Sequence, residues 1–198
     1  VDWQWTPPEL EKAFSNLELL QLSSLSCVLS PGADHLPEAL RSLKKTNPSI
    51  VLTYDPNARP KAAANEAHAQ LMKRRIDELV TLVDLVKVSD EDLAWIAPQD
   101  SPELVAAEWS LRGPKLVVLT RGEQGSQAFC NGKQIASTQI HSLPLIDTVG
   151  AGDTYMAWLI RSIVEDHNLR VPTDAPLVTT MLQQASRAAA INCSRKGC

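Results

Sequence analysis

The sequence predicts an α/β fold in which a mostly parallel β-sheet is covered on both faces by helices. Short apolar segments rich in β-branched residues alternate along the chain with longer amphipathic segments. Such alternation is typical of parallel sheets whose strands are joined by helices. No repeat, low-complexity tract or linker interrupts the 198 residues. We therefore expect a single domain over residues 1–198, long enough to bury a sizeable core.

Four segments have the composition of buried strands, because they are short, apolar and bounded by turn or polar residues. In chain order they are residues 25–30, 49–55, 85–89 and 115–120. Residues 126–138 predict a β-hairpin, since Asn131-Gly132 at their centre is a strong signal for a tight turn.

The helical segments combine apolar residues at helical spacing with recognisable caps. Thr6, Pro7 and Glu9 form a capping-box arrangement that opens the first helix, and Ser101 caps a later one. The remaining helices are expected at residues 37–47, 62–84, 89–97 and 101–113, after Asp153, and at about 176–192.

Composition excludes several classes of partner. The net charge is −4 and there is no basic block, which argues against nucleic acid. No apolar run is long enough to cross a bilayer, and "VDWQWTPPEL" at the N-terminus has no features of a secretory signal. The cysteines form no C-x-x-C pair and no zinc spacing, so we expect reduced thiols and a cytoplasmic protein; they are Cys27, Cys130, Cys193 and Cys198.

A ligand site is expected at one edge of the sheet. In open α/β sheets, ligands bind in the crevice outside the carboxyl ends of the strands. Asp55, Ser89 and Thr120 each come directly after or at the end of a predicted strand, and the loop before Asp153 precedes a helix. These positions are therefore expected to lie around one cavity.

The loop "DTVGAGDT", residues 147–154, points to phosphate chemistry. Gly150, Ala151 and Gly152 have little or no side chain at the mouth of a helix, where exposed N–H groups and partial positive charge suit an anion. Asp153 would repel a phosphate, so we expect it to accept a proton from a hydroxyl that attacks a phosphoryl group. The alternative is that Asp153 only caps the helix. P-loop and G-x-G-x-x-G motifs are absent from the sequence.

Five segments in the same order resemble the PfkB/ribokinase family of carbohydrate kinases, and bacterial fructokinases most closely. They are "VLTYDPNARP", "VKVSDEDLAWI", "VLTRGEQGS", "DTVGAGDT" and "AAAINCSRKG". The resemblance implies a three-layer ribokinase-like fold. It also implies ATP-dependent phosphorylation of a sugar primary hydroxyl, with Mg²⁺ and a K⁺ ion as cofactors. The alternatives are 2-keto-3-deoxygluconate kinase, ribokinase, a nucleotide-binding module without turnover, and a hydrolase in which Asp153 activates water.

The resemblance also assigns roles to single residues. The aspartate of the G-A-G-D loop is the family's catalytic base, here Asp153, and the amides of Gly150, Ala151 and Gly152 would form the anion hole. The nucleotide contacts would come from Thr120, Arg121, Gly122, Gly125, Ser89, Lys87, Gly152 and Ser186. Three plain alternatives exist: an ordinary turn after the strand at 115–120, a solvated Lys87, and a Ser186 that only packs a helix.

The sugar is expected to contact Asp55, Asn57 and Arg59 besides Asp153. Arg59 can bridge substrate and γ-phosphate, because a guanidinium binds oxyanions through two N–H groups. The alternative for Asp55 is a structural one, since Asp-Pro-Asn is also a good turn sequence.

Two metal sites are implied. Asp92 stands where the family has the glutamate of N-x-x-E, and we expect it to serve Mg²⁺ through water. Here the motif reads S-x-x-D, which is also a capping box between Ser89 and Asp92. The K⁺ ion would be held by Asp147, Val149, Asn192, Arg195 and Gly197, although Asp147 can equally be a turn residue.

Family members begin with an N-terminal part that this chain does not show. That part carries a G-G-N sugar motif and a small β-lid, so we expect the chain to supply the C-terminal nucleotide-binding and catalytic portion. Without those strands one edge of the sheet is open, and open edges favour association, which makes a homodimer one expectation.

Overall fold

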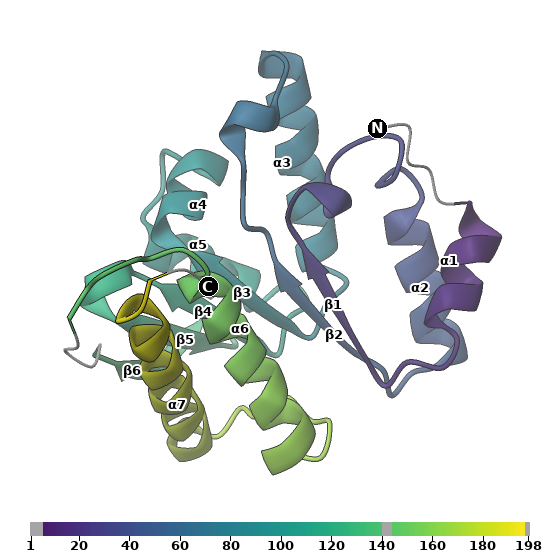
Figure 1. The fold of residues 1–198 in the computed structure, drawn as a ribbon. Helices are drawn as coiled ribbons and strands as arrows, with labels where there is room; N and C mark the ends of the chain where they lie inside the picture. Colours follow the sequence, from purple (N-terminus) through teal and green to yellow (C-terminus); the bar gives the residue numbers. More distant parts are fainter. Residues whose placement is uncertain (1–5, 140–143, 197–198) are drawn as a thin grey trace.

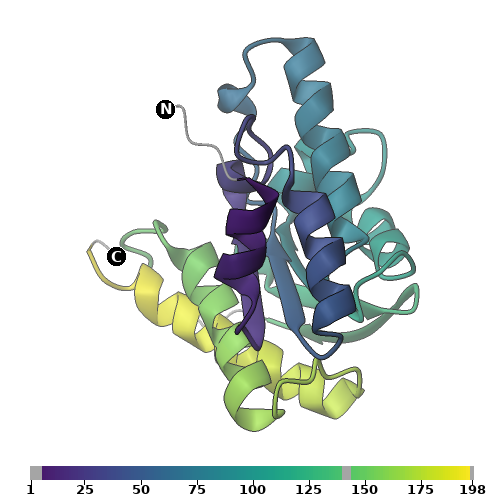
Figure 2. The same cartoon turned by 90° about the vertical axis from the view of Figure 1, so that its right-hand side faces the viewer.

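The computed structural model describes residues 6–139 and 144–196 and shows a six-stranded sheet between two layers of helices (Figures 1 and 2). The strands follow one another in chain order across the sheet. Neighbours are parallel from the first to the fourth strand and antiparallel from the fourth to the sixth. They are β1 (Leu19–Ser23), β2 (Val51–Asp55), β3 (Leu85–Ser89), β4 (Leu116–Thr120), β5 (Ser126–Cys130) and β6 (Lys133–Thr138).

The predicted helices are present, together with short 3₁₀ segments at 24–27, 60–62 and 122–124 and a π-helical turn at 162–166. The α-helices are α1 (Pro7–Phe14), α2 (Leu36–Thr46), α3 (Glu66–Val80), α4 (Asp90–Ile96), α5 (Pro102–Trp109), α6 (Ala151–Arg161) and α7 (Ala175–Cys193). In the described part of the chain, none of them combines the length and the apolarity that a bilayer crossing requires.

Strand order decides which helix covers which face. The helices α2 to α5 connect β1, β2, β3 and β4, which lie in sequence order. Because crossovers between parallel strands are almost always right-handed, all of these connections lie on the same face of the sheet. The opposite face is covered by α6 and α7, which follow the hairpin and lie together at the lower left in Figure 2, across the strands from α2 to α5.

The core is divided by the sheet into two apolar clusters. In β3, Val86 and Val88 pack with α2 to α5, whereas Leu85 packs with α6 and α7. Because side chains alternate along a strand, Lys87 points to the same face as Leu85, toward α6. This alternation is what brings a charged residue of the sheet next to the glycine loop.

One predicted strand was wrong. Residues 25–30 were expected to form the first strand, but β1 is Leu19–Ser23, and the segment after it turns through a 3₁₀ helix at Ser24–Cys27. Ser24 has φ +55°, which ends the extended backbone. Both segments are leucine-rich. The segment Leu19–Ser23 forms the strand because it pairs with the whole of β2, beginning with Leu19 opposite Val51.

The local signals at the ends of other elements are confirmed. The capping box of Thr6 and Glu9 opens α1, and Ser101 caps α5. Asn131 and Gly132 both have positive φ and join β5 to β6, as the turn sequence predicted. These signals depend on a few neighbouring residues, which explains why the sequence alone reveals them.

Candidate active site

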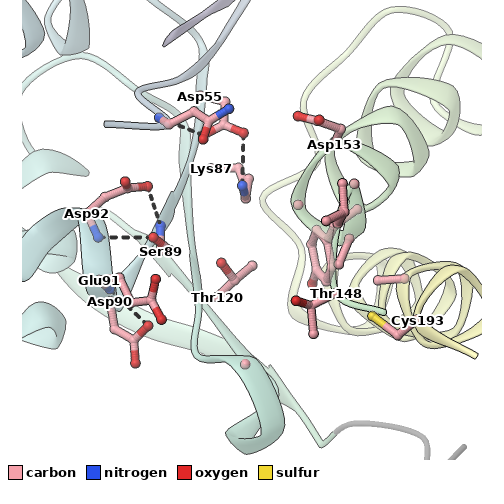
Figure 3. Close-up of a pocket in the computed structure, with 18 of the residues that line it drawn as sticks. Asp55, Lys87, Ser89, Asp90, Glu91, Asp92, Thr120, Thr148, Asp153 and Cys193 are labelled. Carbon is pink, nitrogen blue, oxygen red and sulfur yellow. Dashed lines mark hydrogen bonds and ion pairs between the residues drawn. The ribbon is translucent and has the colours of Figure 1, made fainter. Parts of the chain in front are cut away.

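A cavity of roughly 840 Å³ lies at the carboxyl ends of β2, β3 and β4, where the strand-end rule placed it (Figure 3). The start of α6 and one side of α7 form its opposite wall. The predicted site residues that line it are Asp55, Asn57, Arg59, Lys87, Ser89, Asp92, Thr120, Gly122, Gly125, Val149, Gly150, Ala151, Gly152, Asp153 and Ser186.

The glycine loop forms the first turn of α6. Gly150 is the N-cap residue and has φ +77°, a left-handed conformation that glycine adopts without strain. The N-cap position of α6 is occupied by Gly150 and not by Asp153, whose side chain forms no hydrogen bond with another described residue, so the alternative of Asp153 as a mere helix cap is not supported. Asp153 is the third helical residue, is exposed, and projects toward the side of the cavity where Asp55 and Lys87 lie (Figure 3). Its carboxylate is therefore accessible to a ligand.

Lys87 is not the solvated lysine considered as an alternative. Its side chain is buried, and the ammonium donates a hydrogen bond of 2.8 Å to Oδ2 of Asp55. Burial raises the pKa of the Asp55 carboxyl, and the ammonium of Lys87 opposes that shift. The other oxygen of Asp55 accepts the N–H of Asn57 at 3.1 Å, so the turn predicted for Asp-Pro-Asn is present as well.

Ser89 and Asp92 form the predicted capping box at the start of α4. The Ser89 hydroxyl accepts the N–H of Asp92 at 3.0 Å, and Oδ2 of Asp92 accepts the N–H of Ser89 at 3.3 Å. Oδ1 of Asp92 accepts the N–H of Ala58 at 2.8 Å, which ties the segment after β2 to α4. Both carboxylate oxygens therefore already have a backbone partner.

The loop after β4 contributes glycines rather than a cation to the cavity. Gly122 and Gly125 have φ of +49° and +86°, the unusual values expected for them, and both line the cavity. The side chain of Arg121 pairs instead with Glu103 of α5 at 2.5 Å. Arg121 was predicted as a nucleotide contact; the structure directs its guanidinium to α5, and it is not among the lining residues.

Ser186 lies in a buried polar cluster that fixes α6 to the hairpin. The Tyr155 hydroxyl is 2.6 Å from the Ser126 hydroxyl, and Ser186 counteracts part of the effect of burial on the Tyr155 pKa. Burial raises the pKa of Tyr155 to about 12, so the phenol stays neutral. Ser186 therefore both packs within the helical layer and borders the cavity.

The end of α7 holds the segment before the glycine loop. The Cys193 carbonyl accepts the N–H groups of Ile146 and Asp147. Oδ1 of Asp147 accepts the N–H of Val149 at 2.9 Å, and the Asn192 amide donates to the Val149 carbonyl at 2.8 Å.

Of the K⁺ ligands predicted from the sequence, Asp147, Val149 and Asn192 are thus brought together. The backbone N–H of Arg195 donates a hydrogen bond of 3.2 Å to the Asn192 carbonyl, which keeps Arg195 next to this group. Gly197 lies outside the described residues. Among the described residues, no three His, Cys, Asp or Glu side chains gather as a metal-binding group.

Several lining residues were not predicted. Asp90 and Glu91 follow Ser89 at the end of β3, so the strand-end rule could have included them. Trp95 is three residues after Asp92, which places it on the same side of α4. Cys193 lies seven residues after Ser186 on α7, two helical turns further along the same side, and it also lines the cavity.

Comparison with known proteins gives the same assignment along the whole chain. The model of the pfkB family carbohydrate kinases matches residues 1–198. A fructokinase of Rhizobium leguminosarum bv. trifolii is 33% identical over 165 residues, which are 83% of this chain and 48% of the relative. This chain therefore spans about half the length of that relative.

Two solved structures share the fold. Aminoimidazole riboside kinase from Salmonella enterica, complexed with aminoimidazole riboside and an ATP analogue, has a TM-score of 0.75 at 18% identity, covering 90% of this chain and 57% of its own. Fructokinase from Vibrio cholerae O395, a double mutant with fructose, ADP and potassium ion bound, has a TM-score of 0.73 at 22% identity. The match covers 90% of this chain and 55% of the fructokinase chain. With the family model matching from end to end, the chain belongs to the pfkB family of carbohydrate kinases.

Proposed function

We propose that this protein transfers the γ-phosphoryl group of ATP to a primary hydroxyl of a sugar, with fructose as the first candidate acceptor. The observation that carries the proposal is the exposed carboxylate of Asp153 directly behind the Gly150–Gly152 turn, facing a cavity at the strand ends. The family membership and the 33% identity to a fructokinase support the same reaction. The solved relatives with fructose and ADP, or with a riboside and an ATP analogue, support the two kinds of ligand.

In the proposed reaction Asp153 accepts the proton of the sugar hydroxyl as that hydroxyl attacks the γ-phosphorus. The N–H groups of Gly150, Ala151 and Gly152 would stabilise the charge on the phosphoryl oxygens from positions set by the helix. For this, Ala151 would exchange its present hydrogen bond to the Thr148 carbonyl, 3.2 Å long, for one to the phosphoryl group. Carboxylate and amides share one helical turn. The two reactants therefore meet at the start of α6, with the hydroxyl on the carboxylate side.

The remaining predicted contacts belong to this proposal as well. Thr120, Gly122, Gly125 and Ser186 would border the nucleotide, and all four line the cavity. Asn57 and Arg59 would contact the sugar from the opposite wall, where Arg59 is exposed and available to an oxyanion.

Mg²⁺ and K⁺ are the ions that the proposal includes. Asp92 supplies carboxylate oxygens at the cavity, the donor type that Mg²⁺ prefers, and it would act through water because its oxygens already accept N–H groups. When bound, Mg²⁺ neutralises charge on the phosphates. The Val149 carbonyl accepts one hydrogen bond from Asn192 and keeps a second lone pair for K⁺.

The proposal is tested by coupled ADP release from the full-length protein with Mg²⁺ and ATP. The acceptors are fructose, ribose, 2-keto-3-deoxygluconate and adenosine, with a reaction lacking acceptor as the control. We expect release that depends on fructose. Release that depends on another sugar would replace fructose by that sugar. Release without acceptor would favour a hydrolase, and nucleotide binding without release would favour a binding module.

Cys193 offers an independent test of where the nucleotide binds. It is half-buried at the cavity, whereas Cys27 is buried and its pKa is raised to about 11, mainly by burial. We expect iodoacetamide to alkylate Cys193 before Cys27, and MgATP to slow the Cys193 reaction several-fold. Tryptic peptide 188–195 contains Cys193 as its one cysteine, so mass spectrometry measures it separately. Equal labelling with and without MgATP would place the nucleotide elsewhere.

A further inference from the structure

A buried ion pair lies at the floor of the cavity. Lys87 and Asp55 come from the neighbouring parallel strands β3 and β2, and their side chains are 6% and 2% exposed. Removing two charges from water costs more free energy than an ordinary pair returns, so a buried pair is weak as a stabilising device. Its presence at a ligand cavity therefore suggests a role in binding.

The ammonium of Lys87 has N–H groups to spare. A lysine carries three donors, and among the described residues the acceptor found for Lys87 is Oδ2 of Asp55. Two donors are thus left on a cation that is almost fully buried. The cavity borders this side chain, so an anionic ligand there can accept the remaining N–H groups.

The same ammonium lies beside the glycine loop. A Cβ atom built on Gly152 would stand 3.1 Å from Nζ of Lys87, closer than ordinary van der Waals contact. The ammonium therefore reaches the first turn of α6, where the helix N-terminus adds positive potential. In Figure 3 the ammonium of Lys87 lies next to the carboxylate of Asp55, and Asp153 at the start of α6 lies across from both. Two sources of positive charge converge there, and Asp55 balances one of them.

The carboxylate of Asp55 is bound by the protein itself and is largely out of reach of a sugar. Oδ2 accepts from Lys87 at 2.8 Å and Oδ1 accepts the N–H of Asn57 at 3.1 Å. Each oxygen faces a partner of the protein itself, in a side chain that is nearly inaccessible to solvent. This arrangement suits a residue that holds Lys87 in place better than one that binds a sugar hydroxyl.

We propose that Lys87 binds the transferring γ-phosphoryl group together with the amides of the glycine loop, and that Asp55 is a positioning residue acting through Lys87. The proposal deepens the proposed kinase function and rests on it. The task of Lys87 in this proposal is to stabilise charge on the phosphoryl group, not to move a proton. A side chain at position 152 would press on the ammonium, which would have to shift by a few tenths of an ångström.

The test compares affinities for ADP and for a non-hydrolysable ATP analogue, which differ by the γ-phosphoryl group. In the full-length protein, Lys87→Met should lower the affinity for the analogue by about 10- to 100-fold, which is the fold-change that one charge-assisted hydrogen bond represents. The affinity for ADP should change by less than about threefold on the same scale. Lys87→Arg, which keeps the charge, should recover part of the loss. Lys115→Met is the matched control, because that lysine is exposed at the other end of the sheet.

Asp55→Asn separates positioning from sugar binding. If Asp55 positions Lys87, the variant should have a lower kcat and weaker analogue binding, with an unchanged KM for the sugar. If Asp55 instead binds the sugar, the variant should have a higher KM for the sugar and an unchanged affinity for the analogue, which would overturn the role given to Asp55.

Gly152→Ala tests the contact between Lys87 and the γ-phosphoryl group in a second way. It keeps both charges and is compatible with a helix, so it remains useful even if Lys87→Met leaves Asp55 unpaired and fails to fold. This variant should lose more affinity for the analogue than for ADP.

The outcomes distinguish this proposal from the kinase proposal. The role of Lys87 alone is overturned if the Lys87→Met variant binds the analogue as tightly as the parent protein does. It is also overturned if the variant loses affinity for ADP and for the analogue equally. A parent protein that binds nucleotide with the expected Lys87 dependence but phosphorylates no sugar overturns the kinase proposal alone. A parent protein that binds neither nucleotide overturns both.

Discussion

Replacing Asp153 by Asn is expected to lower kcat by about a thousandfold, within the range that general-base catalysis contributes. The amide keeps the size of the carboxylate but cannot accept the hydroxyl proton. Nucleotide affinity should stay within about threefold, because binding falls to the amides and to other residues of the cavity. Steady-state kinetics with the preferred sugar and calorimetric titration of nucleotide measure the two effects separately.

Thermal unfolding serves as the check on folding for this variant. Asp153 is exposed, and no hydrogen bond ties its side chain to another described residue, so its replacement should leave the unfolding temperature nearly unchanged. Asp166→Asn is the matched control, since Asp166 is also exposed but lies at the end of the π-helical turn, away from the cavity. Turnover of the Asp153 variant within a few-fold of the parent would remove Asp153 from the role of base.

Much of the fold could be predicted because its signals are local. The capping boxes at Thr6 and Ser89 and the Asn131-Gly132 turn each depend on two to four adjacent residues. The strands β2, β3 and β4 are short apolar runs between polar boundaries, and such runs are recognisable without knowledge of their neighbours. Once the structure gives the order of the strands in the sheet, the right-handed crossover rule determines the face of each connecting helix.

The first strand could not be placed in this way, because two leucine-rich segments compete for it. Leu19–Ser23 and the segment after it have similar composition, and only the pairing with β2 distinguishes them. The same limit applied to Lys87, whose burial depends on Asp55 from another strand, 32 residues away. Arg121 is a third case, since its partner Glu103 lies on α5. Partners distant in sequence are not encoded in a local pattern.

The location of the candidate site was more predictable than the tasks of its residues. The strand-end rule placed Asp55, Ser89 and Thr120 around one cavity, and the structure confirms that placement. Which atoms each side chain contacts depends on side-chain packing. The pairing of both Asp92 oxygens with backbone N–H groups, for example, needed the approach of Ala58 from the segment after β2. The roles of these residues in binding and catalysis stay predictions.

Replacing Gly125 by Ala is expected to destabilise the fold by about 3 kcal/mol or more, at the upper end of single-residue effects. Gly125 has φ +86°, and a Cβ atom there would stand 2.0 Å from the Thr138 carbonyl oxygen and 2.9 Å from the Thr138 carbonyl carbon. Both are backbone atoms of the hairpin, so the clash cannot be relieved by rotating a side chain. Either β6 or the loop after β4 has to move.

Gly122→Ala is the matched comparison, because Gly122 lies three residues earlier in the same loop and also has positive φ, +49°. A Cβ atom there meets nothing within 4 Å, so only the left-handed backbone penalty remains, about 1 kcal/mol. Urea denaturation of the two variants measures the free energies of unfolding. Both glycines border the cavity, but a side chain at position 125 displaces backbone whereas one at position 122 does not, so the replacement of Gly125 should weaken nucleotide binding more than the replacement of Gly122 does. Equal destabilisation by the two substitutions would mean that φ, and not the contact with β6, requires glycine at position 125.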